Sequence, residues 1–467
     1  MNFFDMNPEF AAHTLFVDNA GNNYTYQDWY RHAQNLKTVL RPRSLAFVIC
    51  HNRPAAALSY LCCLQNGIVP LLLDAALEKN LYAQLLHRYE PHYIFRPICP
   101  TDTQPLYSLE DYGVFSYAST PLVLHPDLAL LLTTSGSTGS PKLVRQSYAN
   151  IQANAASIAA YLCLTEADRP VSTLPLHYTF GLSVLNSHLL VGAAEYLTED
   201  TVFDPSFWDF CKDFHVTSLA GVPFTYECLN RLHFCNMHLP DLTLMIQAGG
   251  KLSARLHKEF ASFAYKTNKR FIVMYGQTEA TARMSYLPHP YSLSKIGSIG
   301  IPIPGGTFRI MEDEKTEITQ PHVRGELCYE GPNVTLGYAQ CRSDLALGDQ
   351  RHGRLLTGDI AYKDEDGFYY IAGRKKRFLK IQGKRVNLDE IESIIKNAYP
   401  RLECACTGFD DNLCLFVAES AVSADTLEDF LVSKTGLHPA TITIRKLADI
   451  PKTTTGKIAY TVLKDLL

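Results

Sequence analysis

The sequence predicts an α/β protein with a large N-terminal domain of layered α/β sheets and a small α+β C-terminal domain on a hinge. Short apolar runs, such as residues 45–49 and 271–274, alternate with helix-like stretches, such as residues 54–65 and 149–161. This alternation is typical of layers that contain parallel strands. At 467 residues the chain also exceeds the size at which one hydrophobic core stops growing, so we expect at least two domains.

The pattern changes after about residue 310. Residues 325–329 and 367–373 read as short strands bounded by glycine turns, so a small β-rich section closes the large domain. Residues 387–398 then read as a helix, with Asn387 as its cap and acidic residues in its first turn. We therefore expect a large domain over residues 1–375 and a small mobile domain over residues 376–467.

Composition favours a cytoplasmic protein. Lys and Arg number 43, and Asp and Glu number 47. This nearly balanced charge does not favour binding to nucleic acid or to an anionic membrane. The chain begins without a basic region followed by an apolar stretch, and the apolar run 68–73 is too short to span a bilayer. The 13 cysteines lack the paired spacing of a zinc site, which favours reduced thiols. We expect no nucleic-acid partner and no transmembrane segment.

A glycine-rich and hydroxyl-rich segment, residues 133–142, follows the apolar run 128–132. Glycines allow backbone N–H groups to approach a phosphate closely, hydroxyls add donors, and a lysine adds positive charge. The segment lacks the glycine–lysine spacing of a Walker loop, and proline precedes its lysine. We predict a phosphate-binding loop made by Thr134, Ser135, Gly136, Ser137, Thr138, Gly139 and Lys142.

The order of residues in this loop resembles the nucleotide loop of the AMP-forming acyl-adenylate synthetases. That superfamily holds acyl-CoA synthetases, peptide-synthetase adenylation domains and luciferases. A second motif resembles one of theirs: Tyr275, Gly276, Gln277, Thr278 and Glu279 in succession. The resemblance implies that the Tyr275 ring stacks on adenine, that Thr278 contacts the α-phosphate, and that Glu279 is both catalytic and the magnesium ligand. A π face, a hydroxyl and a hard oxygen ligand suit these tasks.

Three further positions match the family in the expected order. The resemblance assigns Asp359, in a Thr-Gly-Asp triplet, to the ribose hydroxyls, and Arg374 to ribose and phosphate. Near the C-terminus, Lys457 follows a glycine and matches the catalytic lysine of the family. It would bridge the attacking carboxylate and an α-phosphate oxygen, which lowers the repulsion between two anions.

The resemblance also implies a hinge and a thiol tunnel. Lys376 matches the hinge position, and Lys380 with Gly383 matches the segment that lines the tunnel for the thiol. Neighbouring basic residues such as Lys375 and Arg377 are as well explained by a solvated basic face.

Departures from the family pattern concern the acyl pocket, which we assign to His177, Tyr178, Gly181 and Gly250. Tyr178 stands where the family commonly has histidine, so the acid can differ from that of relatives. We consider His177 as a base, but a packed or pocket-lining histidine fits the residue type better. Gly181 replaces the aspartate with which relatives bind an ammonium group, which disfavours a free α-amino acid.

The segment 247–251 departs from the family as well. Gly249 still fits close approach to the nucleotide, whereas Lys251 can face an acidic substrate or solvent.

The function implied by the resemblance is ATP- and Mg²⁺-dependent activation of a carboxylic acid to acyl-AMP, followed by transfer to the thiol of coenzyme A. An alternative acceptor is the phosphopantetheine of a separate carrier protein, since no carrier domain follows residue 467. A non-catalytic nucleotide-binding relative would be expected to lose residues such as Glu279 or Lys457, and both are present. A luciferase-type oxygenase shares the motifs but needs a special substrate, of which the sequence gives no sign. The acid, fatty, aryl or other, is not readable from the pocket residues.

Overall fold

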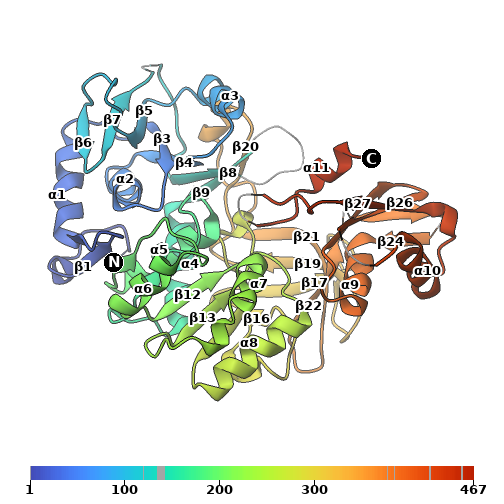
Figure 1. The fold of residues 1–467 in the computed structure, drawn as a ribbon. Helices are drawn as coiled ribbons and strands as arrows, with labels where there is room; N and C mark the ends of the chain where they lie inside the picture. Colours follow the sequence, from blue (N-terminus) through green and yellow to red (C-terminus); the bar gives the residue numbers. More distant parts are fainter. Residues whose placement is uncertain are drawn as a thin grey trace.

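The computed structural model describes residues 2–118, 120–133, 142–375, 377–382, 384–419, 422–453 and 456–467, with the backbone alone for residues 384 and 385. The expected α/β layers, the β-rich section and the small α+β domain are all present (Figure 1). Several predicted positions lie outside the described residues: Thr134, Ser135, Gly136, Ser137, Thr138, Gly139, Lys376 and Gly383.

A nine-stranded sheet forms the first layer, with parallel pairing from β1 through β11, β10, β12 and β13 to β14. Its strands in spatial order are β16 (Ile301–Pro302), β15 (Ser285–Tyr286), β14 (Arg270–Tyr275), β13 (Leu244–Gln247), β12 (Ser218–Gly221), β10 (Pro170–Val171), β11 (Glu195–Tyr196), β1 (Thr14–Val17) and β2 (Asn23–Thr25). In register, β12, β13 and β14 end at the same edge, so the loops that follow them are neighbours.

An eight-stranded mixed sheet forms the second layer. Its strands in spatial order are β20 (Gly337–Ala339), β9 (Leu143–Ser147), β8 (Leu128–Thr133), β4 (Val69–Asp74), β3 (Leu45–Cys50), β5 (Tyr93–Pro97), β7 (Tyr112–Ser116) and β6 (Tyr107–Leu109). Along β3, Leu45 and Phe47 enter one hydrophobic core while Ala46 and Val48 enter another. Both faces of this sheet are therefore covered, which explains its continuous apolar strands.

Helices fill the space around these two sheets (Figure 1). One core joins the eight-stranded sheet to α1 (Tyr26–Lys37), α2 (Pro54–Gln65), α4 (Tyr148–Leu162) and α5 (Thr179–Leu190). A second core joins the nine-stranded sheet to α6 (Pro205–Asp213), α7 (Pro223–Arg231) and α8 (Ala254–Lys266), and α3 (Lys79–Tyr89) covers the far face of the other sheet. Short 3-10 turns are η1 (Pro8–Phe10), η2 (Phe234–Asn236), η3 (Thr278–Ala280), η4 (His289–Tyr291), η5 (Arg342–Ala346) and η6 (Pro439–Thr441).

The β-rich section is a five-stranded antiparallel sheet. Its order is β18 (Glu317–Ile318), β17 (Thr307–Met311), β19 (Gly325–Glu330), β21 (Arg354–Lys363) and β22 (Tyr369–Arg374). It lies between the large layers and the small domain (Figure 1).

The C-terminal domain comprises the elements from β23 onward. A hairpin of β23 (Phe378–Ile381) and β24 (Lys384–Asn387) precedes a three-stranded sheet of β25 (Cys404–Phe409), β26 (Asn412–Ala418) and β27 (Ile442–Leu447), with α9 (Leu388–Ala398), α10 (Ala424–Thr435) and α11 (Tyr460–Asp465). Asn387 caps α9, since its side chain accepts from the N–H groups of Asp389 and Glu390. In the part of the chain that the structure describes, no helix is both long and apolar enough to cross a bilayer.

Candidate active site

One cluster of predicted site residues joins the end of β14 to the five-stranded sheet. The Tyr275 hydroxyl donates a 2.5 Å hydrogen bond to Oδ2 of Asp359, and Nε2 of Gln277 donates to the same oxygen at 3.0 Å. Gln277 also donates to the carbonyl oxygen of Thr357 at 3.0 Å. Asp359 is 4% exposed, and its burial raises its pKa, while the Arg374 guanidinium opposes that rise. The residues predicted to contact adenine and ribose are thus adjacent.

Strand register places Arg374 beside this cluster. The antiparallel pairing of β21 and β22 sets Asp359 opposite Arg374, and Arg374 Nε lies 3.3 Å from Asp359 Oδ1. The Arg374 side chain is 66% exposed, so this pair adds little to stability. The guanidinium is instead accessible to a ligand that binds over Asp359.

Glycines permit the close approach of the site loops. A Cβ at Gly276 would overlap the carbonyl oxygen of Ala282, so only glycine fits where the motif turns back on itself. Gly249 has φ +81°, and a Cβ there would lie 2.6 Å from the Tyr178 hydroxyl oxygen. At Gly250, a Cβ would lie 3.1 Å from the proline ring that begins α7. The loop after β13 therefore packs directly against the predicted acyl pocket.

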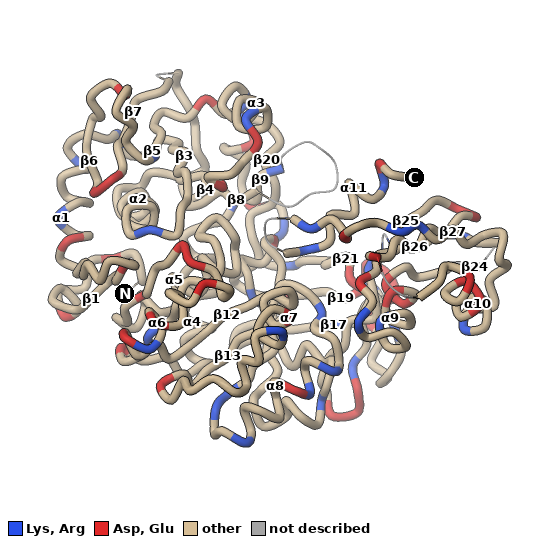
Figure 2. Tube along the Cα trace, in the orientation of Figure 1, with Lys and Arg blue, Asp and Glu red and all other residues tan. Residues whose placement is uncertain are grey.

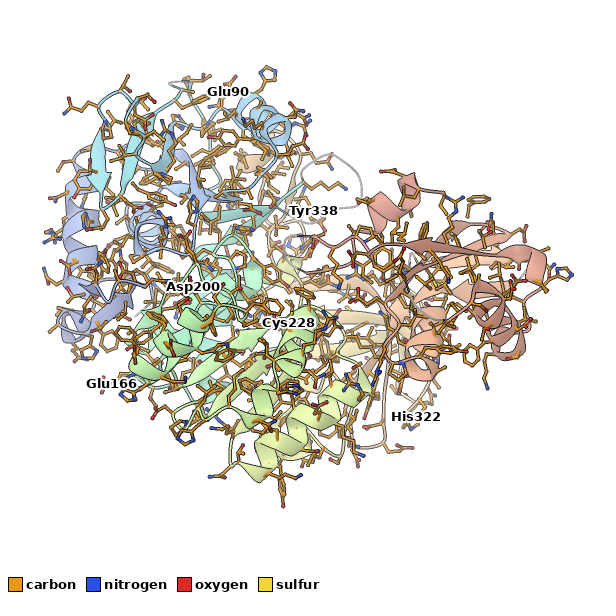
Figure 3. All side chains as sticks on the ribbon, in the orientation of Figure 1. Glu90, Glu166, Asp200, Cys228, His322 and Tyr338 are labelled. Carbon is orange, nitrogen blue, oxygen red and sulfur yellow. The ribbon has the colours of Figure 1, made fainter. Side chains whose placement is uncertain are left out.

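A second cluster surrounds Glu279, which lies in η3. The Tyr338 hydroxyl donates to Oε1 of Glu279 at 2.7 Å, and Arg351 donates to the Glu279 carbonyl oxygen at 3.0 Å. The pairing of β9 with β20 brings Lys142 here, with its Nζ 5.7 Å from the centre of the Tyr338 ring. Tyr338 is labelled near the middle of Figure 3, and Figure 2 shows blue Lys and Arg segments in the same region. One carboxylate and two cations thus gather at one place.

The donor set around Glu279 fits a Mg²⁺ ion that is held mainly by nucleotide phosphates. Such ions use one or two protein carboxylates and retain waters or phosphate oxygens. Within the described ranges, no group of three or more His, Cys, Asp or Glu side chains is arranged to hold a metal by itself. Thr278, the residue before Glu279, is fixed through its carbonyl oxygen, which accepts from Gln146 Nε2 at 3.4 Å.

Lys457 reaches the site from the C-terminal domain. Its Nζ lies 5.3 Å from the centre of the Tyr178 ring. Burial lowers the pKa of Lys457, with a further lowering by Arg374 and an opposing effect from Glu279. The segment is held in a tight loop, because the N–H of Lys457 donates to the Thr453 hydroxyl at 3.2 Å. Lys457 therefore lies beside the acyl-pocket tyrosine, where the charges of Arg374 and Glu279 influence its pKa.

The predicted acyl-pocket residues stand at the start of α5. His177 Nε2 lies 3.6 Å from Oδ2 of Asp74, and its Nδ1 is buried without a hydrogen-bond partner in the part of the chain described. Burial lowers the pKa of His177, and Asp74 opposes the change. Burial also raises the pKa of Tyr178 to about 12. A Cβ at Gly181 would lie 2.5 Å from the carbonyl oxygen of Pro175, so glycine lets α5 pack closely.

Two lysines point away from these clusters. Lys380 is exposed on β23, and its backbone N–H donates to Asp410 at 2.8 Å; among the described residues, its side chain has no contact with the clusters above. Lys251 Nζ lies 3.5 Å from the carbonyl oxygen of Ile371, and Asp389 counteracts the lowering of its pKa by burial. Lys251 is exposed, and its contact is with β22.

Sequence reasoning assigned no role to Tyr338 or Arg351. Neither residue belongs to a motif to which the sequence analysis assigns a chemical role. Their contacts with Glu279 arise from the pairing of β20 with β9 and from the loop after β20, both formed between distant parts of the chain. The Gly337–Tyr338 pair resembles a family landmark in the sequence, and the φ of +124° at Gly337 marks a constrained position in the structure.

Comparison with known proteins identifies relatives of this chain. The family model for "AMP-binding enzyme" matches residues 4–339. An oxalate–CoA ligase from Arabidopsis thaliana is 33% identical over 288 residues, which cover 60% of this chain and 54% of the relative. A long-chain-fatty-acid–CoA ligase from Salmonella typhimurium is 30% identical over 358 residues, covering 74% of this chain and 63% of the relative. The match thus spans less than two thirds of each of these relatives.

Solved structures support the same relationship at the level of fold. O-succinylbenzoate coenzyme A synthetase from Bacillus subtilis, in complex with AMP, superposes with a TM-score of 0.81 at 21% identity, covering 99% of this chain and 98% of that chain. Within the described residues, Tyr275, Asp359 and Arg374 lie together, and the family model covers most of the chain. The chain therefore belongs to the AMP-binding enzyme family.

Proposed function

We propose that the protein activates a carboxylic acid with ATP, forming acyl-AMP and pyrophosphate, and then transfers the acyl group to the thiol of coenzyme A. The observation that carries the proposal is the position of Lys457. It comes from the C-terminal domain, yet its Nζ lies 5.3 Å from the centre of the Tyr178 ring, and both Arg374 and Glu279 influence its pKa. A lysine at this place can hold a carboxylate and an α-phosphate together.

Different residues bind different parts of ATP and the acid in the first step. The Tyr275 ring binds adenine, Asp359 and Arg374 bind the ribose, and Thr278 binds the α-phosphate. Lys142 supplies positive charge for the outer phosphates, together with the loop residues Thr134 to Gly139. Mg²⁺ on Glu279 supplies neutralising charge on the phosphate oxygens when bound. Lys457 orients the carboxylate for in-line attack at the α-phosphorus, where the developing charge is stabilised electrostatically.

The second step requires the domains to rearrange. We place the domain boundary between residues 375 and 376, with Lys376 as the hinge. Rotation there withdraws Lys457 and presents the segment of Lys380 and Gly383 to the incoming thiol. Coenzyme A is the acceptor we favour, because the compared relatives are named as CoA ligases. Phosphopantetheine on a carrier protein is the alternative, and a competition between the two thiols distinguishes them.

The acid class is not fixed by the comparisons, because the relatives named above act on acids as different as oxalate and long-chain fatty acids. A cytoplasmic location forms part of the proposal. It is supported by the 13 cysteines, all of which are free thiols and most of which are buried.

The test is acid-dependent release of pyrophosphate from ATP, coupled to trapping of acyl-AMP with hydroxylamine. The panel contains aryl, short, medium and long fatty, hydroxy, dicarboxylic and amino acids. We expect release with one acid class, and we expect chelation of Mg²⁺ to abolish it. A protein that binds ATP but releases no pyrophosphate with any acid would contradict the proposal.

A further inference from the structure

Arg283 is a buried cation with no carboxylate partner among the described residues. It lies four positions after Glu279 and is 2% exposed. Its Nε donates to the Ser183 hydroxyl at 3.1 Å, and its Nη1 lies 3.4 Å from the Tyr161 hydroxyl and 3.1 Å from Met274 Sδ. Its Nη2 has no hydrogen-bond partner in the described part of the chain. A buried charge with an unpaired donor is costly, so the fold retains donor capacity here for an anion.

Arg145 shows how this fold satisfies a purely structural arginine. It is 0% exposed, and its guanidinium donates to carbonyl oxygens of Leu336, Tyr338, Leu347 and Gly348, as well as to a side-chain amide. Every guanidinium nitrogen of Arg145 therefore has a partner. The fold can therefore give a buried arginine a full set of hydrogen-bond partners, and Arg283 differs from Arg145 in lacking one.

The position of Arg283 relates it to the acyl pocket. Its guanidinium carbon lies 5.0 Å from the centre of the Phe180 ring. The Phe180 and Tyr178 rings are 6.3 Å apart, and Lys457 Nζ lies 5.3 Å from the Tyr178 ring. Two aromatic rings at the start of α5 thus separate two cations. An acid that lies along these rings with one carboxylate at Lys457 would direct its far end toward Arg283.

The surroundings of Arg283 are polar as well. Ser183 also lines a small cavity between α4 and α5, together with Asn154 and Thr281 and with apolar residues that include Ile151 and Leu182. Asn154 donates to the carbonyl oxygen of Arg283 at 2.9 Å, while its own Oδ1 is buried without a partner among the described residues. A buried donor on Arg283 and a buried acceptor on Asn154 therefore both lack a partner among the described residues, and a purely hydrocarbon acyl chain would satisfy neither of them.

The backbone before Arg283 is constrained to direct it inward. Thr281 and Ala282 have φ values of +51° and +91°, a conformation that residues with a side chain rarely adopt. Such conformations persist where the surrounding structure enforces them, and they concentrate at functional sites. Gly276 packs directly against this turn, so the turn is coupled to the nucleotide motif.

We propose that Arg283 binds a second carboxylate of the acyl substrate, so that the enzyme selects dicarboxylic acids over monocarboxylic ones. This inference rests on the proposed adenylation activity and names its substrate class. The reacting carboxylate lies at Lys457, and the remote carboxylate accepts hydrogen bonds from the Arg283 guanidinium. Acids that lack the remote charge leave a buried cation unpaired and bind less well.

The test compares each dicarboxylic acid with its half-amide, which has nearly the same shape and lacks one charge. Both acids are assayed on the same preparation by pyrophosphate release, so their ratio of kcat/KM does not depend on the folded fraction. We expect the wild-type enzyme to favour the dicarboxylic acid by about 10-fold or more. In Arg283→Met we expect kcat/KM for the dicarboxylic acid to fall about 100-fold, with a change below about threefold for the half-amide and for the KM of ATP.

Arg283→Lys is the matched variant, because it retains the charge and shortens the hydrogen-bonding group. We expect it to keep part of the preference for the dicarboxylic acid. Equal activity of the wild type on both members of a pair would overturn the inference and leave the proposed function intact. So would an equal loss with both acids in Arg283→Met, since that marks a structural role. No release with any acid would contradict the proposed function, and this inference with it.

Discussion

Lys457 is the residue whose chemistry should separate the two half-reactions. It supplies a charge between the carboxylate and the α-phosphate in the first step and is withdrawn before the second. We expect Lys457→Ala to slow acyl-AMP formation about 100-fold to 1,000-fold, the effect typical of removing one preorganised charge. Thioester formation from supplied acyl-AMP should change by less than about threefold. Both rates are measurable by quenched-flow assays of each half-reaction.

Lys464 provides the control for this change. It lies exposed on α11 in the same C-terminal segment. Lys464→Ala should leave both half-reactions at the wild-type rate. If Lys457→Ala slowed the thioester step as severely as the adenylation step, the proposed division of roles would be wrong.

Tyr338 should matter for binding of the magnesium–ATP complex. Its hydroxyl holds one oxygen of the Glu279 carboxylate at 2.7 Å. Tyr338→Phe removes a hydrogen bond to a charged group, so we expect the KM for ATP to rise about 10-fold, with little change in the KM for the acid. Titration of activity with Mg²⁺ and ATP measures the effect. Tyr370→Phe is the control, because the Tyr370 hydroxyl also donates to a carboxylate, that of Asp364 at 3.2 Å; an equal rise there would contradict the role of Tyr338.

For single residues, the sequence predicts those in motifs better than the residues that contact them in the folded protein. Tyr275, Asp359 and Lys457 are named from local patterns, and the structure brings their side chains to one region. Tyr338 and Arg283 are not predictable in this way, because their importance depends on what lies across a sheet or behind a helix.

Strand β11 carries a buried carboxylate in the middle of the nine-stranded sheet. Glu195 is 2% exposed, its Oε2 has no partner among the described residues, and burial raises its pKa to about 8. In the unfolded chain this pKa is near 4.5. The folded state therefore binds one more proton between these values, and the stabilising contribution is complete below about pH 4.5 and is lost as pH rises toward 8.

Glu195→Gln tests this pH dependence. The variant should remove a slope of about 1.4 kcal/mol per pH unit from the free energy of unfolding between pH 5 and 8, and it should be more stable than the wild type at pH 9. Urea denaturation at several pH values measures the slope. Glu199→Gln is the control, because Glu199 is exposed and paired with Arg53 at 2.7 Å. Identical slopes in the wild type and Glu195→Gln would contradict a protonated Glu195.

At the scale of elements, helices with strong boundary signals are predicted well. Helix α2 has the expected bounds of 54–65, and α4 covers 148–162 where 149–161 was expected. The Asn387 cap predicts the start of α9, which the structure confirms. Strand order is not predictable from the sequence, because pairing such as that of β10 with both β11 and β12 depends on contacts between distant segments.

At the scale of the whole molecule, the C-terminal domain docks on α7. Lys452 Nζ lies 4.8 Å from the centre of the Phe224 ring and 3.0 Å from Glu403. Glu403 is also 3.6 Å from Arg231 at the end of α7. These ion pairs are partly exposed and weak, so close packing contributes more to this arrangement. The docking places Lys457 at the site, and no local sequence pattern predicts it.

Gly456 is the point at which this packing can be disturbed. It has φ +73°, and a Cβ there would lie 3.1 Å from Cβ of Phe224. We expect Gly456→Ala to displace Lys457 and to slow adenylation about 10-fold to 100-fold, with little effect on thioester formation from supplied acyl-AMP. Separate assays of the two half-reactions measure the difference.

Gly436→Ala is the matched control for backbone strain. Gly436 follows α10 with φ +64°, and a Cβ there would meet nothing within 4 Å. Both alanine variants should lose about 1 kcal/mol of stability from the left-handed conformation, yet only Gly456→Ala should lose adenylation activity. A loss of adenylation in both variants would show that strain alone, and not docking on α7, explains the effect.

The hydrophobic core of the C-terminal domain has a consequence for folding. Its buried members run from Leu379 to Ile442, and a second apolar cluster lies between Ala405 and Leu463. Among the described residues, neither cluster includes a side chain from before the β23 strand. The domain therefore has what it needs to unfold and refold as a cooperative unit of its own. Among the described residues, its attachment depends on surface contacts with α7 and on contacts of α9 with β22, such as the hydrogen bond from the Arg374 N–H to Asp389, and on no shared core; such a unit can be exchanged between related chains as a module.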